Sequence, residues 1–501
     1  MDAVVDQKDR RYAALLHGRN LRFPESPEVA PGSIVLCSSA TDVRHALQEA
    51  VSRGLRPTVR SGGHCYENFS ATNPGGVLLD ISLLNRVSVD AASKHCRVEP
   101  GAVLGDVYQA LYKRAGVTLP AGSCYTVGAG GHISGGGYGL LSRLHGLSSD
   151  WLTAVDILTV DNSGTVKERH VNQKSDPDLF RACRGAGSAG FGIITSYYFE
   201  QLPTAPREVI EFGVGFPWET MSEEQFTDLL TTFGDYWATR GRDPDTWGLF
   251  AILTVGARKP RGRLGMYIQF CQPNGSAQDL YVLHEFLDRF DKFGPSYGGR
   301  GGAPAKPHSD PLIHARKPWL VAATSDHSGG GQIRGKFKSA YMKRSVTPQE
   351  AQTIYRFYSG DSVTAQASVV AFDSYGGAVN RPELLGETAI AQRSSIMKLQ
   401  WQCYWQDASD DPQYLRELDA FYTALYSGSH VDADHQGTPW GDGYEGCYMN
   451  YPDADMLRYA YWPSLYYGRG DLYAFLQQVK HSYDPNNIFH HAMSVRPLQG
   501  T

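Results

Sequence analysis

The segment PAGSCYTVGAGGHISGGGY, from Pro120 to Tyr138, carries the strongest local pattern in the chain. Seven of its nineteen residues are glycine, which lets a backbone approach a flat or phosphorylated ligand closely. Val127, His132 and Ile133 interrupt the glycines, and the segment contains no Lys, Asp or Glu. We therefore expect an ordered, buried turn. It is either a cofactor cradle or a structural loop, because glycine content alone does not separate the two.

The 501-residue chain is long enough for two domains, and 42% apolar with 20% charged residues is typical of globular proteins. A net charge of -5 gives no reason to expect nucleic acid or an anionic membrane as a partner. No apolar run is long enough for a membrane span, and no signal region is visible, so we expect a cytoplasmic protein. The eight cysteines are scattered without a CxxC pair, which predicts neither a disulfide framework nor a metal site.

Ahead of the glycine-rich segment the chain has a βαβ pattern. We expect strands at 34–37 and 57–60, with a helix capped by Thr41 and ended by Gly54 between them. The second strand runs into SGGHCY at 61–66, where a glycine pair frees N–H groups that suit an anion. A third spaced glycine and a following helix are missing, which disfavours a nicotinamide-type Rossmann site.

Behind that segment, a second ligand-binding turn is predicted. Residues 154–160 and 165–170 are expected to form a hairpin, and 176–184 a short helix. A glycine-rich turn at 185–190 then opens into a strand at 191–194. Two such turns in one half of the chain suggest that they bind one ligand from two sides.

A domain boundary is predicted near residues 203–206, where the composition changes. Beyond it we expect strands and long helices that form an antiparallel sheet with helices on one face; the strands are 207–216, 246–255 and 264–271, and the helices 222–239 and 278–293. Residues 294–311 are rich in Gly and Pro and predict a long loop.

Two short segments in the last quarter of the chain carry candidate site residues. Residues 396–402 alternate as a strand, with Lys398, Gln400 and Gln402 on one face, either a solvent face or a pocket wall. Residues 448–453, YMNYPD, place two tyrosines and an amide in what we expect to be an extended run. A helix near 471–480 and a turn at 483–487 complete the chain.

The motifs together resemble the berberine-bridge-enzyme group of flavin oxidases, within the vanillyl-alcohol-oxidase fold. The resemblance rests on RSGGHCY at 60–66, the segment 120–138, GFGII at 190–194, YMNYPD at 448–453 and YDPNN at 483–487. It implies an α+β protein with a two-lobed FAD-binding domain at 1–205. A substrate domain with a helix-covered antiparallel sheet would follow at 206–440, and a segment at 441–501 would return to the FAD domain.

The resemblance also implies FAD attached through two covalent bonds, from His64 to the ring methyl group and from Cys124 to the neighbouring carbon. Both residues are nucleophiles suited to this chemistry, although each read singly is a buried core residue. The other residues expected at the cofactor are Arg60, Ser61, Gly62, Gly63, Cys65, Tyr66, Gly122, Val127, Gly128, Gly131, His132, Gly135, Gly136, Gly137, Gly190, Gly192, Ile194 and Asn450.

The expected chemistry is removal of a hydride from an alcohol carbon, which requires a base beside the flavin. Tyr451 is the first candidate and Tyr448 the second. A free tyrosine has a pKa of about 10, so it needs help near neutral pH. Lys398, with Gln400 beside it, lies on a strand that resembles the family's active-site strand, and its ammonium would favour the phenolate. Tyr138 matches a position where relatives place a substrate-contacting tyrosine.

Valine at 127 resembles the oxidases of the group, so we expect reoxidation by O2 with release of H2O2. RSGGHCYENF at 60–69 and FHHAMSVRP at 489–497 resemble glycopeptide hexose oxidases and aclacinomycin-type sugar oxidases, which suggests an alcohol on a sugar or a glycosylated natural product. Two alternatives stay open: a dehydrogenase that passes electrons to a carrier, and a flavin-bearing protein that binds a small molecule without turnover. The sequence leaves the substrate and the oligomeric state open.

Overall fold

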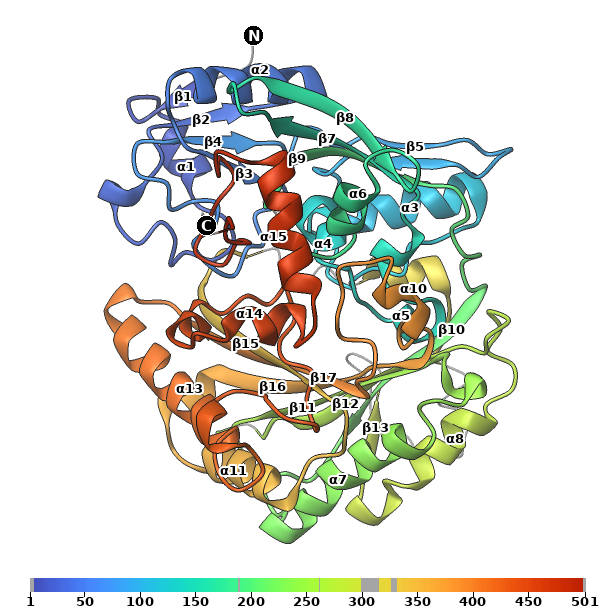
Figure 1. The fold of residues 1–501 in the computed structure, drawn as a ribbon. Coiled ribbons are helices and arrows are strands. Elements are labelled where there is room, and N and C mark those ends of the chain that lie inside the picture. Colours follow the sequence, from blue (N-terminus) through green and yellow to red (C-terminus); the bar gives the residue numbers. More distant parts are fainter. Residues whose placement is uncertain (1–3, 188–189, 261, 299–314, 326–330, 499–501) are drawn as a thin grey trace.

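The computed structural model describes residues 4–187, 190–260, 262–298, 315–325 and 331–498. Three β-sheets, two small and one large, form the frame of this part of the chain. The small sheets lie in the upper half of Figure 1 and the large sheet in the lower half, with helices packed around both. The prediction of an α+β fold is confirmed.

The first small sheet contains the predicted βαβ unit. It has the order β1–β2–β4–β3, in which β2 and β3 both pair in parallel with β4; its strands are β1 (Val4–Asp6), β2 (Ser33–Leu36), β3 (Pro57–Arg60) and β4 (Val77–Asp80). The helix α2 (Ala40–Ser52) connects β2 to β3. Its cap is Ser39 and not Thr41, because the Ser39 hydroxyl accepts the N–H of Asp42 at 3.2 Å.

The second small sheet is antiparallel, with the order β5–β6–β9–β7–β8; its strands are β5 (Val87–Val89), β6 (Cys96–Val98), β7 (Ala154–Val160), β8 (Val166–Asn172) and β9 (Ile193–Phe199). The predicted hairpin is formed by β7 and β8. Three helices of this half are α3 (Leu104–Ala115), α5 (Ser142–His145) and α6 (Pro177–Cys183).

The large sheet is antiparallel and contains eight strands in the described ranges, in the order β13–β10–β12–β11–β16–β17–β15 with β14 beside β10. Its strands are β10 (Glu208–Gly215), β11 (Leu249–Gly256), β12 (Leu264–Phe270), β13 (Ser296–Gly298), β14 (Arg316–Pro318), β15 (Arg334–Met342), β16 (Ser368–Ser374) and β17 (Met397–Trp405). Only β10, β11, β12 and β17 correspond to predicted strands.

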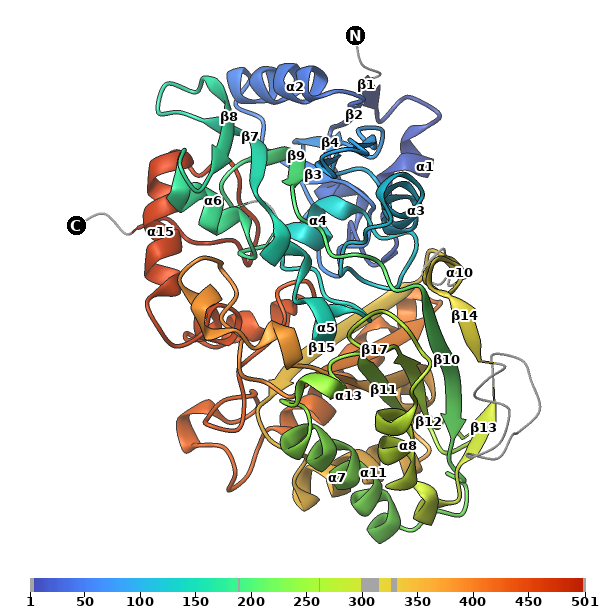
Figure 2. The same ribbon diagram turned by 90° about the vertical axis from the view of Figure 1, so that its right-hand side faces the viewer.

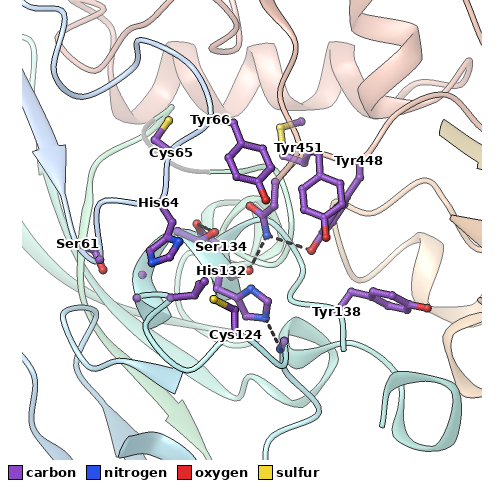
Figure 3. Close-up of a pocket in the computed structure, with 18 of the residues that line it drawn as sticks. Ser61, His64, Cys65, Tyr66, Cys124, His132, Ser134, Tyr138, Tyr448 and Tyr451 are labelled. Carbon is purple, nitrogen blue, oxygen red and sulfur yellow. Dashed lines mark hydrogen bonds between the residues drawn. The ribbon is translucent and has the colours of Figure 1, made fainter. Parts of the chain in front are cut away.

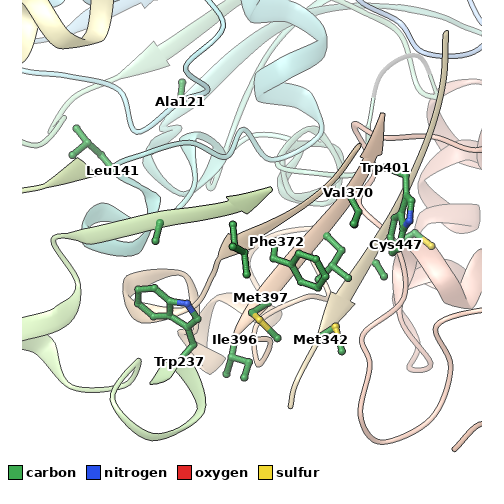
Figure 4. Close-up of a cluster of buried hydrophobic side chains, with 14 of the residues drawn as sticks. Ala121, Leu141, Trp237, Met342, Val370, Phe372, Ile396, Met397, Trp401 and Cys447 are labelled. Carbon is green, nitrogen blue, oxygen red and sulfur yellow. The ribbon is translucent and has the colours of Figure 1, made fainter. Parts of the chain in front are cut away.

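Helices cover the face of this sheet that points away from the small sheets (Figures 1 and 2); they are α7 (Glu223–Thr239), α8 (Tyr281–Asp288), α11 (Pro348–Ser359) and α13 (Asp411–Leu425). Apolar residues at alternate positions of β16 and β17 pack in the core under these helices. They include Val370, Phe372, Met397 and Trp401, which Figure 4 shows in one cluster. The opposite face of the sheet is therefore left for other side chains.

Three more helices lie near the sheets. The helix α10 (Trp319–Ser325) follows β14 and packs against α3. The helices α14 (Trp462–Tyr467) and α15 (Leu472–Tyr483) belong to the last part of the chain, and α15 packs against α6 in the upper half of Figure 1.

A buried arginine ties the two halves together. Arg143, on α5, is fully buried, and burial lowers its pKa to about 10. Its Nε donates to the carbonyl of Leu249 at 3.0 Å and another nitrogen donates to the carbonyl of Tyr375. The guanidinium also lies 4.5 Å from the ring centroid of Trp237. The start of β11 and the end of β16 are thereby fixed against the glycine-rich half.

The structure corrects three local predictions. Residues 120–138 are not only a turn, because α4 (Ala129–Ser134) forms within them. Residues 448–453 form a turn and not an extended run, since the N–H of Tyr451 donates to the carbonyl of Tyr448 at 2.9 Å. The helix predicted at 278–293 is limited to α8 and a 3-10 turn at 291–293. Most of the loop predicted at 294–311 lies outside the described residues.

Candidate active site

A cavity of about 940 Å³ lies between the small sheets and the uncovered face of the large one. Its size is at the upper end of small-molecule sites. Both glycine-rich turns, the 448–453 turn and the strands β11, β12, β16 and β17 contribute to its walls. Figure 3 shows ten of the lining residues with labels.

Most of the predicted cofactor residues line this cavity. The lining includes Arg60, Ser61, Gly62, Gly63, His64, Cys65, Tyr66, Gly122, Cys124, Val127, Gly128, Gly131, His132, Gly190, Gly192, Ile194 and Asn450. Gly135, Gly136 and Gly137 are not in it. A side chain at these three positions would meet Asn450, Ile390 and Ser148 respectively, so their glycines serve packing.

The glycines of the cavity wall suit a flat cofactor. A Cβ on Gly62 would lie 2.3 Å from the backbone nitrogen of Gly128, so the two turns touch backbone to backbone. A Cβ on Gly131 or Gly190 would meet no atom within 4 Å, so these two glycines border open space. A wide cavity with close-packed backbone on one side has the shape that an isoalloxazine and its diphosphate chain require.

Arg60 has a structural partner. Its guanidinium pairs with the carboxylate of Asp80 at 2.7 Å, and both side chains are 6% exposed. It also donates to the carbonyls of Leu15 and Leu16. The charge is therefore already balanced within the protein, and Arg60 holds the end of β3 from which the 61–66 turn begins.

His64 and Cys124 lie on neighbouring loops. The Nε2 atom of His64 lies 3.1 Å from the hydroxyl of Thr126, two residues after Cys124. Burial and the nearby Arg19 lower the pKa of His64 to about 4. The imidazole is therefore neutral at pH 7 and carries a nitrogen lone pair. None of the eight cysteines, all of which lie in described ranges, is disulfide-bonded.

The candidate base Tyr451 is connected to the large sheet. Lys398 Nζ, on β17, donates to the Tyr451 hydroxyl at 3.1 Å and pairs with the Asp373 carboxylate of β16 at 2.8 Å. Lys398 is fully buried. Its ammonium also lies 4.6 Å from the ring centroid of Tyr138 and 5.2 Å from that of Tyr448. One buried cation thus contacts all three tyrosines named from the sequence.

The expected effect of Lys398 on the phenol is only partly present. Burial raises the pKa of Tyr451 well above 10, and the charge of Asp373 raises it further. Burial also raises the pKa of Tyr448, although Lys398 and the Asn450 amide oppose that rise. Burial is the largest cause of the raised Tyr451 pKa, and the carboxylate of Asp373, which pairs with the Lys398 ammonium, adds to it.

The remaining predicted residues have identifiable partners. The Asn450 amide donates to the carbonyl of His132 at 2.9 Å and to the hydroxyl of Tyr448 at 3.1 Å. The hydroxyl of Tyr138 donates to the carbonyl of Ser374, so it is engaged with the end of β16. The Gln400 amide donates to the Tyr66 hydroxyl at 3.1 Å. Lys398, Gln400 and Gln402 form a cavity wall and not a solvent face.

Two functional features escaped the sequence analysis. Asp373 is the acidic partner of Lys398, and no local pattern indicates it, because the residues before it, VVAF at 369–372, are all apolar. The second feature is the lysine Lys336 on β15, which is 2% exposed and pairs with Glu67 at 2.7 Å and with Asp453 at 2.6 Å. Burial would lower the pKa of Lys336, but Asp453, Glu67 and Asp455 raise it above 10.5.

Lys336 joins three segments that each carry a ring of the cavity wall. The rings of Tyr66 and Phe337 stack with centroids 3.6 Å apart, and those of Tyr66 and Tyr451 lie 5.5 Å apart. Glu67 and Lys336 are the chain neighbours of the first two rings, and Asp453 lies two residues after Tyr451. The buried ion pairs behind the wall therefore fix the positions of the rings in front.

Two sequence families match parts of the chain. Residues 31–168 match the family described as FAD binding domain, and residues 447–496 match the family described as berberine and berberine like. The first covers the turns at 61–66 and 120–138, and the second covers the turn that carries Tyr451. Within the described ranges, no helix is both long and apolar enough to cross a membrane.

Whole-length relatives agree with these matches. The chain is 34% identical to the aclacinomycin-N/aclacinomycin-A oxidase of Streptomyces galilaeus, over 98% of this chain and 89% of that protein. It is 32% identical to the hexose oxidase of Chondrus crispus, over 90% of this chain and 87% of that protein.

A solved structure extends the likeness to the fold. It is an oxidoreductase that catalyses the terminal step of gilvocarcin biosynthesis, in complex with pregilvocarcin, with a TM-score of 0.88 and 32% identity over 99% of this chain and 100% of that one. The glycine-lined cavity, the two matched regions and these full-length relatives lead to one conclusion: the chain belongs to the berberine-bridge-enzyme-like family of FAD-linked oxidoreductases.

Proposed function

We propose that this oxidoreductase holds FAD through His64 and Cys124 and oxidises a CH–OH group of a sugar or glycosylated compound, with O2 as acceptor and H2O2 as product. The relatives named above support the reaction class, since they include an aclacinomycin oxidase and a hexose oxidase. The observation that carries the proposal is the chain of contacts at the cavity wall in which Lys398 donates a hydrogen bond to Tyr451 and pairs with Asp373.

Bound FAD supplies the acceptor for the hydride that leaves the substrate carbon. The protein handles the proton. Lys398 gives a proton to Asp373 and takes the phenolic proton into the lone pair that this frees, while the phenolic oxygen takes the proton of a substrate hydroxyl beside it. The hydrogen bond in which Lys398 donates to Tyr451 at rest reverses during this transfer. Such a transfer avoids a free phenolate, which the raised pKa of Tyr451 disfavours. Its net result is a protonated Asp373 and an unchanged Tyr451 and Lys398.

Attachment at His64 and Cys124 is supported by their surroundings. The low pKa of His64, about 4, leaves its lone pair available at neutral pH. The hydrogen bond between His64 and Thr126 holds the two loops side by side. Both residues line the cavity, so both can reach one ligand.

The division into an FAD domain at 1–205, a substrate domain at 206–440 and a returning segment at 441–501 is part of this proposal. It is supported by the strand pairing, because the small sheets use residues 4–199 and the large sheet uses residues 208–405. Packing of α15 against α6 supports the returning segment. We further propose that the enzyme works in the cytoplasm, which suits eight cysteines without a disulfide, and that it has no nucleic-acid partner.

The base is tested by anaerobic stopped-flow reduction of the flavin. Tyr451→Phe removes the hydroxyl that Lys398 contacts, and we expect reduction about 10²–10⁴-fold slower with normal flavin content. Tyr448→Phe is the matched control, because it removes a neighbouring hydroxyl that accepts from Asn450 instead. Equal slowing in both variants, or no slowing in Tyr451→Phe, would reject the assignment.

The attachment is tested by the intact mass of acid-denatured protein. Wild type should carry the added mass of one FAD, and His64→Ala and Cys124→Ala should each retain it through the other bond. The double variant should lose it. A wild-type mass equal to that of the bare polypeptide would refute both bonds.

A further inference from the structure

We propose that the substrate is a glycoside of an apolar, ring-shaped aglycone with a hydrogen-bonding group at its far edge, rather than an oligosaccharide. This inference rests on the proposed function, since it places the sugar beside Tyr451. It comes from the pattern of side chains on the cavity face of the large sheet.

The first zone of that face is polar and lies at the reacting end. Lys398 and Gln400 of β17 and Asp373 of β16 are in it. Lys398 contacts Tyr451 and Gln400 contacts Tyr66, so this zone is continuous with the proposed base. Its amide, ammonium and carboxylate groups suit the hydroxyls of one sugar ring.

The second zone is apolar. Phe250 and Ile252 of β11 and Val369 and Ala371 of β16 line the middle of the cavity floor, and Thr254 adds one hydroxyl. Phe250 and Ile252 pack in one cluster with Tyr138 and Tyr448. A sugar placed here would lose water from several hydroxyls without replacement partners, at a cost of about 1–3 kcal/mol for each. An aromatic or alicyclic ring system would instead bury apolar area favourably.

The third zone is polar again and lies on β10 and β12. The Tyr267 hydroxyl donates to the Glu211 carboxylate at 2.6 Å, and Lys317 pairs with the same carboxylate at 2.8 Å. Beside them, Gln269 is only 2% exposed and lines the cavity. Its side-chain amide can donate to and accept from a hydrogen-bonding group at the far edge of the ligand.

The strand register sets the distance between the polar zones. Lys398 pairs with Asp373, Asp373 with Ile252, and Ile252 with Tyr267, so the four residues form one row across the sheet. Three strand spacings separate Lys398 from Tyr267, or about 14 Å at roughly 4.8 Å each. A single sugar does not reach both ends, whereas a sugar joined to a fused ring system extends along the row.

Binding to the FAD-loaded protein tests the inference by calorimetry with three probes: 2-naphthol, 2,6-dihydroxynaphthalene and cellotriose. The naphthalenes should bind more tightly than cellotriose. The second hydroxyl should improve affinity about tenfold through Gln269, the effect of one hydrogen bond that satisfies a buried amide. Gln269→Leu should abolish that difference and leave the affinity for 2-naphthol unchanged or improved.

Two results would overturn the inference: tighter binding of cellotriose than of either naphthalene, or a hydroxyl effect that survives in Gln269→Leu. The second would mean that water already satisfies the amide. Anaerobic flavin reduction by a panel of sugars and naphthyl glycosides separates this outcome from the proposed function. Failure of every compound to reduce the flavin, with the binding pattern intact, rejects the proposed function alone. Reduction without the binding pattern rejects the aglycone site alone.

Discussion

Replacement of Lys336 by methionine tests the argument that buried ion pairs fix the aromatic wall. Methionine keeps most of the apolar stem and removes the ammonium. Glu67 and Asp453, whose side chains are 4% and 3% exposed, would then lose a shared cation. Removal of one partner from a buried pair costs about 3–5 kcal/mol, since the remaining charge stays desolvated. For a large domain this corresponds to a fall in Tm on the order of 10 °C.

A double variant separates charge from packing. Glu67→Gln in the Lys336→Met background removes the carboxylate that lost its partner, while Asp453 still pairs with Lys338 at 2.8 Å. We expect the double variant to regain stability, with a coupling free energy of about 1–3 kcal/mol in a double-mutant cycle. Urea unfolding of the four proteins at constant flavin content measures this quantity.

Flavin reduction is the second readout. Lys336→Met should lower the reduction rate, because Tyr66 and Tyr451 are no longer held in their stack. Lys338→Met is the matched control, since Lys338 is equally buried and pairs with Asp453, Asp455 and Asp419 but not with Glu67. Lys338→Met should lower the free energy of unfolding by a similar amount to Lys336→Met, and it should lower the rate of flavin reduction less. The reasoning would be refuted if Lys336→Met had the same Tm as the wild type. It would also be refuted if Lys338→Met and Glu67→Gln showed the same coupling free energy as Lys336→Met and Glu67→Gln.

Two further predictions concern the glycine-rich segment. Val127 lines the cavity, so the added methylene of Val127→Leu should slow reoxidation of the flavin by O2 about tenfold. The rate of anaerobic flavin reduction should stay unchanged. A wild-type reoxidation rate in stopped-flow measurements would contradict this prediction. His132 is half-buried, and its Nε2 accepts the N–H of Gly122 at 3.0 Å. Burial and Lys398 lower the pKa of His132 from 6.5 to about 4 in the folded protein. Between pH 6.5 and pH 4 the unfolded chain therefore binds more protons at this residue than the folded protein does. The free energy of unfolding falls as the pH drops through this range, by at most about 1.4 kcal/mol per pH unit. His132→Asn should reduce this slope in urea unfolding at pH 7, 6 and 5, whereas identical slopes would assign the titration elsewhere.

Local sequence patterns predicted the parts of the fold that depend on neighbouring residues. Alternation placed Lys398 and Gln400 on one face of β17 and Trp401 on the other, and turn residues located the hairpin of β7 and β8. The glycine-rich turns and the motif residues His64 and Cys124 were likewise visible, because backbone freedom and nucleophilic chemistry are properties of single residues. They predicted a cofactor cavity, and the residues do gather in one.

The sequence could not predict which charges become buried and paired. Lys398 meets Tyr451 across 53 residues of sequence, and Lys336 meets Glu67 across 269. A lysine on an alternating strand has the same local pattern whether it faces solvent or a cavity, and β15 and β16 were not predicted at all. Pairing between distant strands decides such contacts, since it sets the register of the whole sheet.

The chain by itself therefore determined two glycine-rich turns, because close backbone approach requires glycine. The resemblance of its motifs to a known family predicted that these turns hold FAD. The tertiary structure decided the rest of the site. The strand order placed the Asp373 carboxylate beside the Lys398 ammonium, so that the two charges pair. The same order placed Gln269 of β12 three strands away from Lys398 of β17, across an apolar floor. The physical reason is that burial and pairing, which fix pKa values and ligand preference, arise only when distant segments exclude water together.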